Sequence, residues 1–349
     1  MPRLICGPMA TLSHEAFRRS VERFGGCDEY FTEMINAPSL LNRGPFERYY
    51  LLNGPAPEKI VWQLTGNRAG PLAEAAALVA ERGGIGVDIN MGCSAPQIYR
   101  TGAGIAWMTR PLEETREAVR AVRQALVPFP AMRLSVKCRL GDEDFTDGGF
   151  FAFTDMLADE GVQLITLHPR TRKEKSRGLP RHEYVEKLCL RYGGRLQVYL
   201  NGGVKDAGTL QAALAAAPDT DGVMIARAAA QKPWLFAELK HTRIIEGNAG
   251  VLTDPADDST DGPRVGPTDG PLKIDCQQLA LDFIADVEAC QPPEFYRTRL
   301  QRFFAYYCDN FSFAHYFKTK MLNTSSPDEC RAQVLDYFAR QSGDRYRTL

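Results

Sequence analysis

The sequence lacks any long apolar run, and no stretch approaches the roughly 20 consecutive apolar residues that a transmembrane helix needs. The start, residues 1–8, also has too short an apolar run for the core of a secretory signal. We therefore expect a cytoplasmic protein that does not associate with membranes.

An excess of either charge is also missing. The 349 residues include 42 Lys and Arg against 43 Asp and Glu, which gives a net charge of −1. This balance excludes a histone-like or polybasic protein, although a local basic patch remains compatible with it. The fractions of hydrophobic residues (44%) and charged residues (24%) are those of an ordinary globular protein.

Closely spaced cysteines are absent. Nine cysteines are spread over the whole chain, and no two have the Cys-x-x-Cys spacing of a zinc or redox motif. The odd number predicts free thiols in a reducing compartment, most of them buried as small core residues. The sequence thus predicts no metal site, and only Cys93 lies in a context that suggests chemistry.

Residues 1–243 alternate short β-branched runs with longer amphipathic runs. Eight runs are expected to form strands, at residues 4–6, 29–31, 60–64, 86–90, 134–138, 164–167, 197–200 and 222–225. Helical patterns such as 71–81 and 112–126 separate them, which implies parallel pairing. Eight such units predict an α/β fold of the (β/α)8 TIM-barrel type, and an open doubly wound sheet is the competing fold.

The composition changes after this barrel. Residues 246–271 contain five Gly, four Pro and five Asp but no aromatic residue, so we expect 244–272 to be a flexible acidic linker or insertion. A long ordered surface loop is the alternative. Residues 273–349 have a helical pattern, and they predict a small all-α bundle. Its helices are expected near 273–290, 294–309, 312–322 and 327–341.

Polar or glycine residues follow nearly every predicted strand, where the active sites of TIM barrels lie. Gly202 and Gly203 follow the seventh strand and Arg227 follows the eighth, a combination that predicts phosphate binding. A tight turn with a surface arginine is the alternative interpretation.

Three further polar residues are predicted at the same barrel mouth. Lys137 is costly there unless an anion faces it, and it would stabilise the negative charge of a reduced flavin. Gln63 offers a donor and an acceptor to a planar heterocycle, and His168 offers another donor. Next to a phosphate site, these groups favour flavin mononucleotide (FMN) as the ligand.

Cys93 follows the fourth predicted strand. An unperturbed thiol has a pKa of about 8.5, so it is mostly protonated near neutral pH and can act as a general acid. Hydride addition to a conjugated carbon–carbon bond leaves carbanion character that needs a proton. A flavin and a thiol together therefore favour reduction of an activated double bond. An inert core cysteine is the alternative.

Seven short motifs follow one another along residues 1–240. They are Phe31-Thr32-Glu33-Met34, Asp88-Ile89-Asn90-Met91-Gly92-Cys93, Thr101-Gly102-Ala103-Gly104, Val136-Lys137-Cys138-Arg139, His168-Pro169-Arg170-Thr171-Arg172, Asn201-Gly202-Gly203 and Val223-Met224-Ile225-Ala226-Arg227. In order and spacing these motifs resemble the tRNA-dihydrouridine synthase family. The resemblance implies an FMN-bound TIM barrel followed by a helical tRNA-binding domain. Such an enzyme reduces the C5–C6 double bond of chosen uridines in tRNA, and NADPH recharges the flavin.

The resemblance also implies roles for individual residues. Cys93 would donate a proton to C5 of the uridine while the flavin delivers a hydride to C6. Asn90, Arg170 and Arg172 would meet the uridine or its neighbouring phosphates. The flavin and its phosphate would be held by Pro8, Met9, Ala10, Gln63, Lys137, His168, Asn201, Gly202, Gly203, Ala226 and Arg227.

The chain departs from the family pattern at three places. Ser94 follows the cysteine where the family usually has Pro, and Ala226 precedes Arg227 where it usually has Gly. Residues 173–177, Lys-Glu-Lys-Ser-Arg, replace a polar-aromatic run.

The predicted helical domain is neutral as a whole but not in its middle. Residues 295–320 contain five Lys and Arg against Asp309 alone, together with ten aromatic residues. We expect Arg299 and Arg302 to contact RNA phosphates, and most of the aromatic residues to form the core of the bundle. The protein is expected to be a monomer when free.

Two other functions fit parts of this pattern. A small-molecule flavin reductase, of the dihydroorotate or enoate type, would share the phosphate and lysine elements but not the basic helical domain. An RNA-binding protein with impaired catalysis would fit Ser94 and Ala226, but not the presence of Cys93 and Lys137.

Overall fold

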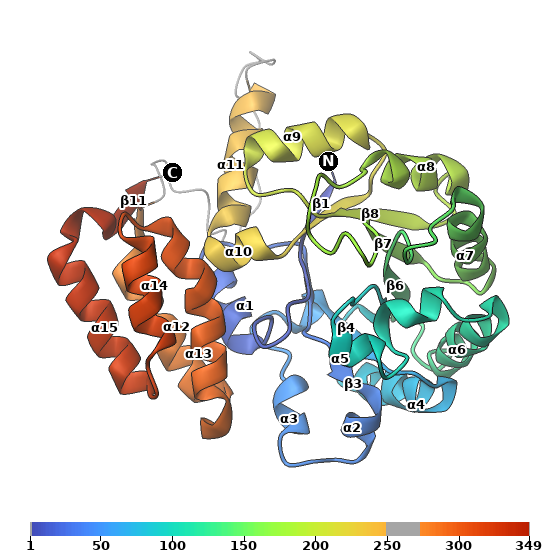
Figure 1. The fold of residues 1–349 in the computed structure, drawn as a ribbon, viewed down its shortest axis with the longest axis horizontal. Coiled ribbons are helices and arrows are strands. Elements are labelled where there is room, and N and C mark those ends of the chain that lie inside the picture. The colour runs from blue at the N-terminus through green and yellow to red at the C-terminus, as the bar shows by residue number, and fades with distance from the viewer. Residues whose placement is uncertain (1, 249–272, 349) are drawn as a thin grey trace, which may run out of the picture.

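Eight parallel strands close into a barrel in the computed structural model, which describes residues 2–248 and 273–348 without the side chains of 243–248 (Figure 1). The strands are β1 (Arg3–Cys6), β2 (Glu29–Phe31), β4 (Ile60–Thr65), β5 (Gly86–Met91), β6 (Arg133–Arg139), β7 (Leu164–His168), β8 (Gln197–Asn201) and β9 (Gly222–Ile225). Each pairs with the next, and β9 returns to pair with β1. The predicted TIM barrel is confirmed, and each predicted strand agrees to within one residue at each end.

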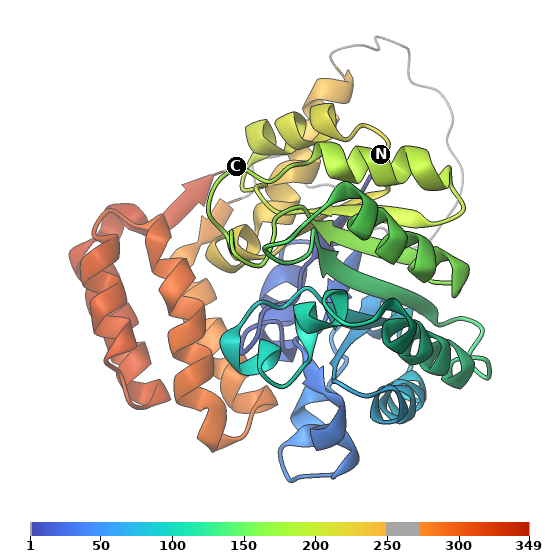
Figure 2. The same ribbon diagram turned by 45° about the vertical axis from the view of Figure 1, so that its right-hand side comes forward.

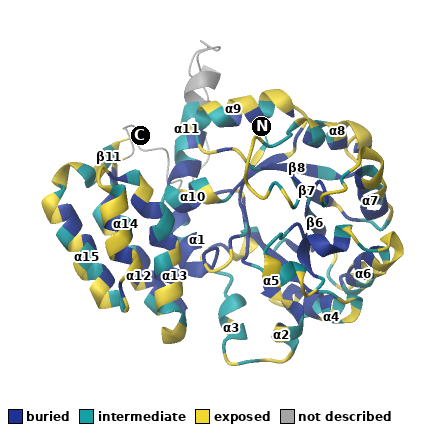
Figure 3. Ribbon diagram, viewed as in Figure 1, coloured by how far each residue is buried: buried dark blue, intermediate teal, exposed yellow. Residues whose placement is uncertain are grey.

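Helices between the strands cover the outside of the barrel (Figures 1 and 2). The longer ones are α1 (Glu15–Glu22), α4 (Ala69–Ala80), α6 (Leu112–Ala125), α7 (Asp147–Asp159), α8 (Glu183–Tyr192), α9 (Ala207–Ala216) and α11 (Leu235–Asn248). Leu72, Ala76 and Val79 form the buried stripe of α4, as their helical spacing predicts. The barrel strands are almost wholly buried, whereas the outer faces of these helices are exposed (Figure 3).

The pleat of the strands sorts the barrel interior into layers, because alternate side chains point inward. Near the amino ends of the strands lies a polar layer around Glu29. Beyond it comes an apolar layer formed by Ile5, Phe31, Val61, Leu164, Tyr199 and Met224. The layer nearest the carboxyl ends is polar again and forms the floor of the cavity described below.

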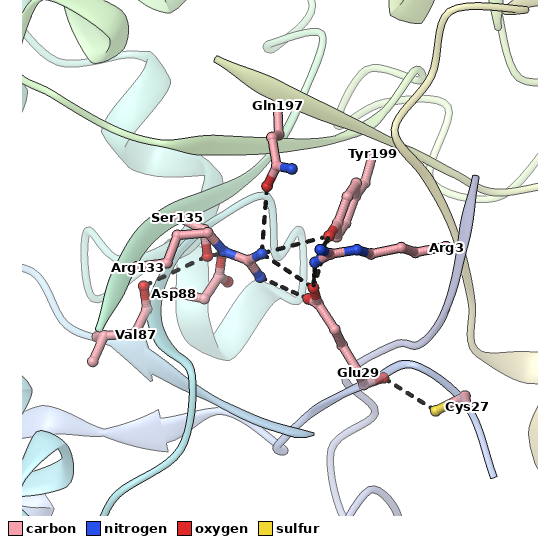
Figure 4. A network of polar contacts seen from close by, with 9 residues as sticks. All are labelled: Arg3, Cys27, Glu29, Val87, Asp88, Arg133, Ser135, Gln197 and Tyr199. Carbon is pink, nitrogen blue, oxygen red and sulfur yellow. Dashed lines mark hydrogen bonds and ion pairs between the residues drawn. The ribbon is translucent and has the colours of Figure 1, made fainter. Parts of the chain in front are cut away.

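An ion-pair network closes the amino end of the barrel (Figure 4). Glu29 is 1% exposed and accepts hydrogen bonds from Arg3, Arg133 and Tyr199. Its contact with Arg133 is bidentate, with the shorter bond of 2.6 Å joining Arg133 Nη2 to Glu29 Oε2. These partners satisfy the buried carboxylate at the end of the barrel opposite the cavity.

Several short elements were not predicted from the sequence. After β2 the chain makes an excursion through β3 (Ile35–Asn36), α2 (Ala37–Leu41) and α3 (Glu47–Tyr50). Strand β3 extends the sheet by pairing with β4. Further short helices follow strands, namely α5 (Pro96–Tyr99), the 3-10 helix η2 (Gly104–Met108) and α10 (Arg227–Gln231).

The C-terminal domain is helical, as predicted, but it also contains one small sheet. Its helices are α12 (Cys276–Cys290), α13 (Pro293–Tyr307), α14 (Ala314–Leu322) and α15 (Pro327–Arg340). The unpredicted strands β10 (Lys273–Asp275) and β11 (Tyr346–Thr348) pair antiparallel. Aromatic residues fill the bundle core, where Phe283, Phe303 and Tyr307 stack in succession. The bundle packs on the barrel, with α12 beside α1 and α13 beside α10 (Figure 1).

The boundary of the predicted linker differs from the structure. Helix α11 continues to Asn248, so residues 244–248 are helical. Residues 249–272, the rest of the predicted linker, lie outside the described residues.

Two further observations concern the described part of the chain. No helix within it is long and apolar enough to cross a membrane. All nine cysteines are free thiols, as predicted, and each is buried except Cys93 and Cys189, which are partly exposed.

Candidate active site

The carboxyl ends of the strands open into a cavity of about 830 Å³. This volume falls in the range of about 300–1,000 Å³ that is usual for ligand pockets. Every residue predicted for catalysis or cofactor binding lines this main cavity. They are Pro8, Met9, Ala10, Gln63, Cys93, Lys137, His168, Asn201, Gly202, Gly203, Ala226 and Arg227.

Strand pleating brings the polar residues of the floor together. Gln63, Asn90, Lys137, His168 and Asn201 lie on five consecutive strands, and each occupies an inward-facing position. The registers of the parallel pairs place Asn90 beside Lys137 on neighbouring strands. Residues far apart in the sequence therefore form one polar surface.

A chain of hydrogen bonds fixes the orientation of Gln63. Gln63 Nε2 donates to Asp88 Oδ2 at 2.8 Å, and Asn90 Nδ2 donates to Gln63 Oε1 at 2.9 Å. Ser135 Oγ donates to the other oxygen of Asp88 at 2.7 Å (Figure 4). Burial raises the pKa of Asp88 to about 6, so the group remains a carboxylate at neutral pH. Since a carboxylate only accepts hydrogen bonds, Gln63 must direct its amide N–H toward it.

The loop that carries Cys93 is held from two sides. Asn90 Oδ1 accepts hydrogen bonds from the backbone N–H groups of Cys93, at 2.9 Å, and Gly92, at 3.2 Å. The Cys93 carbonyl accepts from Ile105 at 3.1 Å. Gly104 has a φ of +63°, and a Cβ there would lie 2.6 Å from the Cys93 carbonyl oxygen. The backbone of Cys93 is thus fixed in the cavity wall, and its side chain is half-buried there.

Arg139 ties the Cys93 loop to the loop that follows β7. Its Nε donates to the Gly92 carbonyl at 3.0 Å, and its Nη1 donates to the Lys175 carbonyl at 2.6 Å. Burial, followed by the charge of Arg170, lowers the pKa of Arg139 to about 10, so it stays cationic at neutral pH.

Lys137 projects a half-buried ammonium group into the main cavity. None of the described residues accepts a hydrogen bond from its Nζ. Burial, followed by the charge of Arg139, lowers the pKa of Lys137 to about 8. Since an ammonium group has three donors to satisfy, the position suits an anionic or strongly accepting ligand atom.

His168 is a neutral hydrogen-bond donor in this setting. Arg170 Nη1 lies 2.8 Å from His168 Nε2, and because a guanidinium can only donate, Nε2 must accept. The proton of the neutral ring is then on Nδ1. Burial, with the positive charges of Arg139, Lys137 and Arg170, holds the pKa of His168 far below its ordinary value.

A glycine pair after β8 forms a cradle in the cavity wall. Gly202 and Gly203 have φ values of +108° and +86°, which L-residues with side chains rarely adopt. A Cβ on Gly202 would lie 2.8 Å from His168 Cδ2. The exposed guanidinium of Arg227 has no carboxylate partner among the described residues. Backbone amides and a free cation therefore lie together, as phosphate binding requires.

The residues predicted to contact substrate are placed in different surroundings. Asn90 and Arg302 line the main cavity, and Arg302 reaches it from α13 with Tyr306. Arg172 lines a smaller neighbouring cavity, where its Nε donates to Asp142 Oδ1 at 2.7 Å. Of the departures from the family pattern, Ser94 lines both cavities and Ala226 lines the main one.

Two of the predicted RNA contacts do not fit the geometry and need correction. Arg299 is 2% exposed, and its Nη1 pairs with Glu33 Oε2 at 2.6 Å between α13 and the barrel. Arg170 is 4% exposed and is occupied by His168 and by the carbonyl groups of Arg177 and Gly178. Both guanidinium groups serve internal contacts, so neither is available to a phosphate in this structure.

Sequence reasoning missed three contributors to the cavity. Asp88 orients Gln63, Arg139 ties two loops together, and Tyr306 enters from the helical domain. Asp88 and Arg139 have a signal in the sequence, because strand alternation gives them the same inward phase as Asn90 and Lys137. Tyr306 has none, since its place depends on how the two domains pack.

Comparisons with known proteins agree with this arrangement. Residues 4–251 match the family model described as dihydrouridine synthase (Dus). The chain is 32% identical over 246 residues to the "Probable tRNA-dihydrouridine synthase" of Aquifex aeolicus, an alignment that covers 70% of this chain and 74% of that protein. It is 31% identical over 241 residues to the "Probable tRNA-dihydrouridine synthase 1" of Synechocystis, covering 68% and 64%. A human protein named "tRNA-dihydrouridine(47) synthase [NAD(P)(+)]-like" is 32% identical over 244 residues, covering 69% and 36%.

Proposed function

The chain belongs to the dihydrouridine synthase family, and from this premise we propose that it reduces the C5–C6 double bond of specific uridines in tRNA. Members of this family are flavin-dependent oxidoreductases. We propose FMN as the flavin and NADPH as the reductant that recharges it. The observation that carries the proposal is the meeting of Cys93, Lys137 and the glycine cradle in one cavity.

The residues of the main cavity fit FMN in three respects. The positive-φ glycines 202 and 203 line the cavity together with Arg227, so their backbone lies beside a cation that suits a phosphate. Lys137, whose ammonium group has no hydrogen-bond acceptor among the described residues, suits the electron-rich edge of a reduced flavin ring. Gln63 retains one N–H and one acceptor lone pair for a planar heterocycle, because its other groups are bound to Asp88 and Asn90.

When bound, reduced FMN supplies a hydride, which would add to C6 of the uridine. Cys93 would transfer its thiol proton to C5, so that two hydrogens are added across the double bond. The resulting thiolate takes a proton from water. Asn90 would hold the Cys93 backbone during this step, since its side-chain oxygen accepts two N–H bonds from the loop.

A uridine within folded tRNA must leave its base stack to enter such a cavity. Exposed cations at the cavity rim, including Lys205 and Arg302, are suited to the backbone of the approaching RNA. We propose that the enzyme acts on tRNA as a monomer in the cytoplasm, where nine free thiols would persist.

Mapping of dihydrouridine in tRNA tests this proposal. Cells that lack the protein should lose dihydrouridine at one or a few tRNA positions and regain it when the gene is returned. An unchanged dihydrouridine pattern in the deletion would contradict the proposed function.

A second experiment tests the phosphate site separately. Arg227→Ala should lower the FMN content of purified protein, because a charge-assisted bond worth roughly 1.5–3 kcal/mol is lost. The exposed Arg82, at the opposite end of the barrel, provides the control variant Arg82→Ala. Equal flavin occupancy in the two variants would show that Arg227 does not bind the FMN phosphate.

A further inference from the structure

A second cavity of about 390 Å³, here called the side cavity, adjoins the main cavity. The two share Ser94, Pro96 and Lys175 in their walls. The side cavity contains five cationic residues and one carboxylate. Apart from the three shared residues, its lining consists of Tyr99, Arg100, Glu143, Arg172, Lys173 and Arg177.

Only part of this positive charge is neutralised within the protein. Arg172 pairs with Asp142 at 2.7 Å, and Lys173 lies 4.0 Å from Glu143. Arg100, Lys175 and Arg177 have no carboxylate partner among the described residues. Three free cations beside a concave surface favour an anionic ligand.

The backbone of the side cavity is tied to the catalytic loop. Lys175 has a φ of +53°, a strained value for a residue with a side chain. Arg139 holds it there by donating to its carbonyl at 2.6 Å, and the same guanidinium donates to the carbonyl of Gly92, which precedes Cys93. A ligand in the side cavity would therefore be held at a fixed position relative to the thiol.

The aromatic ring in this wall has one face covered by a cation. The guanidinium of Arg172 lies over the Tyr99 ring, 4.5 Å from its centre. Recognition here then depends on charge, which phosphate and sugar satisfy regardless of the base.

We propose that the side cavity binds the phosphate and sugar of the nucleotide next to the target uridine, through Arg100, Lys175 and Arg177. This inference rests on the proposed function, because it assigns the main cavity to a uridine of RNA. The volume of the side cavity suits one nucleotide unit, and Lys175 lies where the two cavities meet. The subsite would fix the register of the RNA strand, so that one uridine faces Cys93.

The test compares two triple variants of the flavin-loaded protein. Arg100→Gln, Lys175→Gln and Arg177→Gln together remove the free cations of the side cavity. The control replaces Arg82, Arg123 and Arg195 with Gln, because these exposed cations precede strands at the opposite end of the barrel. Binding of a tRNA transcript is measured at several salt concentrations, together with the KM values for tRNA and NADPH.

The side-cavity variant should bind tRNA at least tenfold more weakly than the control. The slope of log affinity against log salt should become shallower by about two to three, because each lost phosphate contact removes just under one unit. FMN content and the KM for NADPH should not change. The double variant Arg100→Lys and Arg177→Lys, which keeps Lys175, should retain the wild-type salt slope.

Unchanged tRNA affinity and salt slope in the side-cavity variant would overturn the inference. A higher KM for NADPH with an unchanged tRNA affinity would also overturn it, and would assign the cations to the phosphate of the reductant. Because binding is measured apart from turnover, failure of the proposed function can be distinguished from failure of this inference. In that case the wild-type protein would bind tRNA through these cations but form no dihydrouridine.

Discussion

Lys137 combines a half-buried position with an ammonium group that donates a hydrogen bond to none of the described residues. The cost of holding such a charge in the barrel is offset only when an anion or a strong acceptor faces it. Its lowered pKa, about 8, reflects that cost in the free protein. The residue is therefore expected to contribute more to the reactivity of the flavin than to the stability of the fold.

Lys137→Met should slow reduction of the bound flavin by NADPH roughly 10- to 100-fold, as expected for loss of a charged hydrogen bond worth about 1.5–3 kcal/mol. FMN should stay bound, since the glycine cradle and Arg227 are intact. In the wild type the rate should fall as the pH rises above about 8, the pKa of Lys137 in the free protein, because the ammonium loses its proton and the electron-rich flavin edge raises its pKa. Stopped-flow flavin absorbance measures both effects. The exposed Lys187 provides the control Lys187→Met. If the rate of Lys137→Met still falls over the same pH range, Lys137 is not the group whose deprotonation slows flavin reduction.

Gly104 shows how backbone geometry fixes the loop of Cys93, the proposed general acid. Gly104→Ala places a Cβ 2.6 Å from the Cys93 carbonyl oxygen at a φ of +63°. Gly83 provides a matched control, because its φ is +81° but nothing lies within 4 Å of an added Cβ. Both variants should lose about 1–2 kcal/mol of folding stability from strain, and Gly104→Ala should lose more because its Cβ clashes with the Cys93 carbonyl. Only Gly104→Ala should also lose turnover, measured as dihydrouridine formed at saturating tRNA. Equal turnover in the two variants would show that Gly104 does not position Cys93.

Two arginines three positions apart show what charge patterns leave undecided. Arg299 and Arg302 looked equivalent because both lie in a basic, aromatic segment. The buried stripe of α13 contains Leu300, Phe303 and Tyr307, and Arg299 lies four residues before Phe303, on the same side of the helix. The helical phase thus assigns Arg299 to the interface, whereas charge alone predicted an RNA contact.

At the scale of elements, the strands were predictable because each is a short apolar run with a polar residue at its exit. The same rule located the cavity, since all its predicted residues sit at or just beyond strand ends. The strands β10 and β11 gave no local signal, because their pairing joins segments about 70 residues apart in sequence. The excursion through β3, α2 and α3 was also missed, because its elements have only two to five residues each.

The ion pair between Glu33 and Arg299 joins the two domains. Glu33 Oε2 accepts from Arg299 and also from the backbone N–H of Thr11, which follows the cavity-lining residue Ala10. Arg299→Leu should destabilise the protein by about 3–5 kcal/mol, because it leaves a buried carboxylate without its partner. Urea denaturation measures the loss.

The exposed Arg297 on the same helix provides the control Arg297→Leu. Adding Glu33→Gln to Arg299→Leu should recover part of the stability, since the unpaired charge disappears. A destabilisation no larger than that of Arg297→Leu would show that the ion pair does not hold the domains together.

On the scale of the whole molecule, the residues that stabilise the barrel and those proposed for the reaction lie at opposite ends of its axis. Glu29 and its partners occupy the amino end (Figure 4). The residues proposed for the reaction line the cavity at the carboxyl end. Burial raises the pKa of Glu29, but the hydrogen bonds and charges of Arg133, Tyr199 and Arg3 outweigh it and leave the pKa below its ordinary value. The network therefore stabilises the fold wherever Glu29 is ionised.

The lowered pKa of Glu29 predicts how acid affects the stability of the fold. The contribution of Glu29 should be complete above about pH 4.3, the ordinary pKa of Glu, and should be lost as the pH falls through the lower value of the folded state. Glu29→Gln should lower stability near neutral pH and make the decline in acid shallower, as followed by urea denaturation over a pH series. Glu113→Gln, at an exposed carboxyl group, is the control. Parallel acid profiles for wild type and Glu29→Gln would contradict this assignment.

The proposed reaction requires a thiol and a reduced flavin to act on the same uridine. Single-turnover oxidation of the prereduced, FMN-loaded protein by a tRNA transcript without oxygen tests this most directly. In the wild type, flavin absorbance should return as dihydrouridine forms in equal amount. Cys93→Ala should bind flavin and tRNA normally but react about 10²- to 10⁴-fold more slowly, the usual contribution of a general acid. Equal rates for the two proteins, or a wild-type flavin that bound tRNA does not oxidise, would contradict the account.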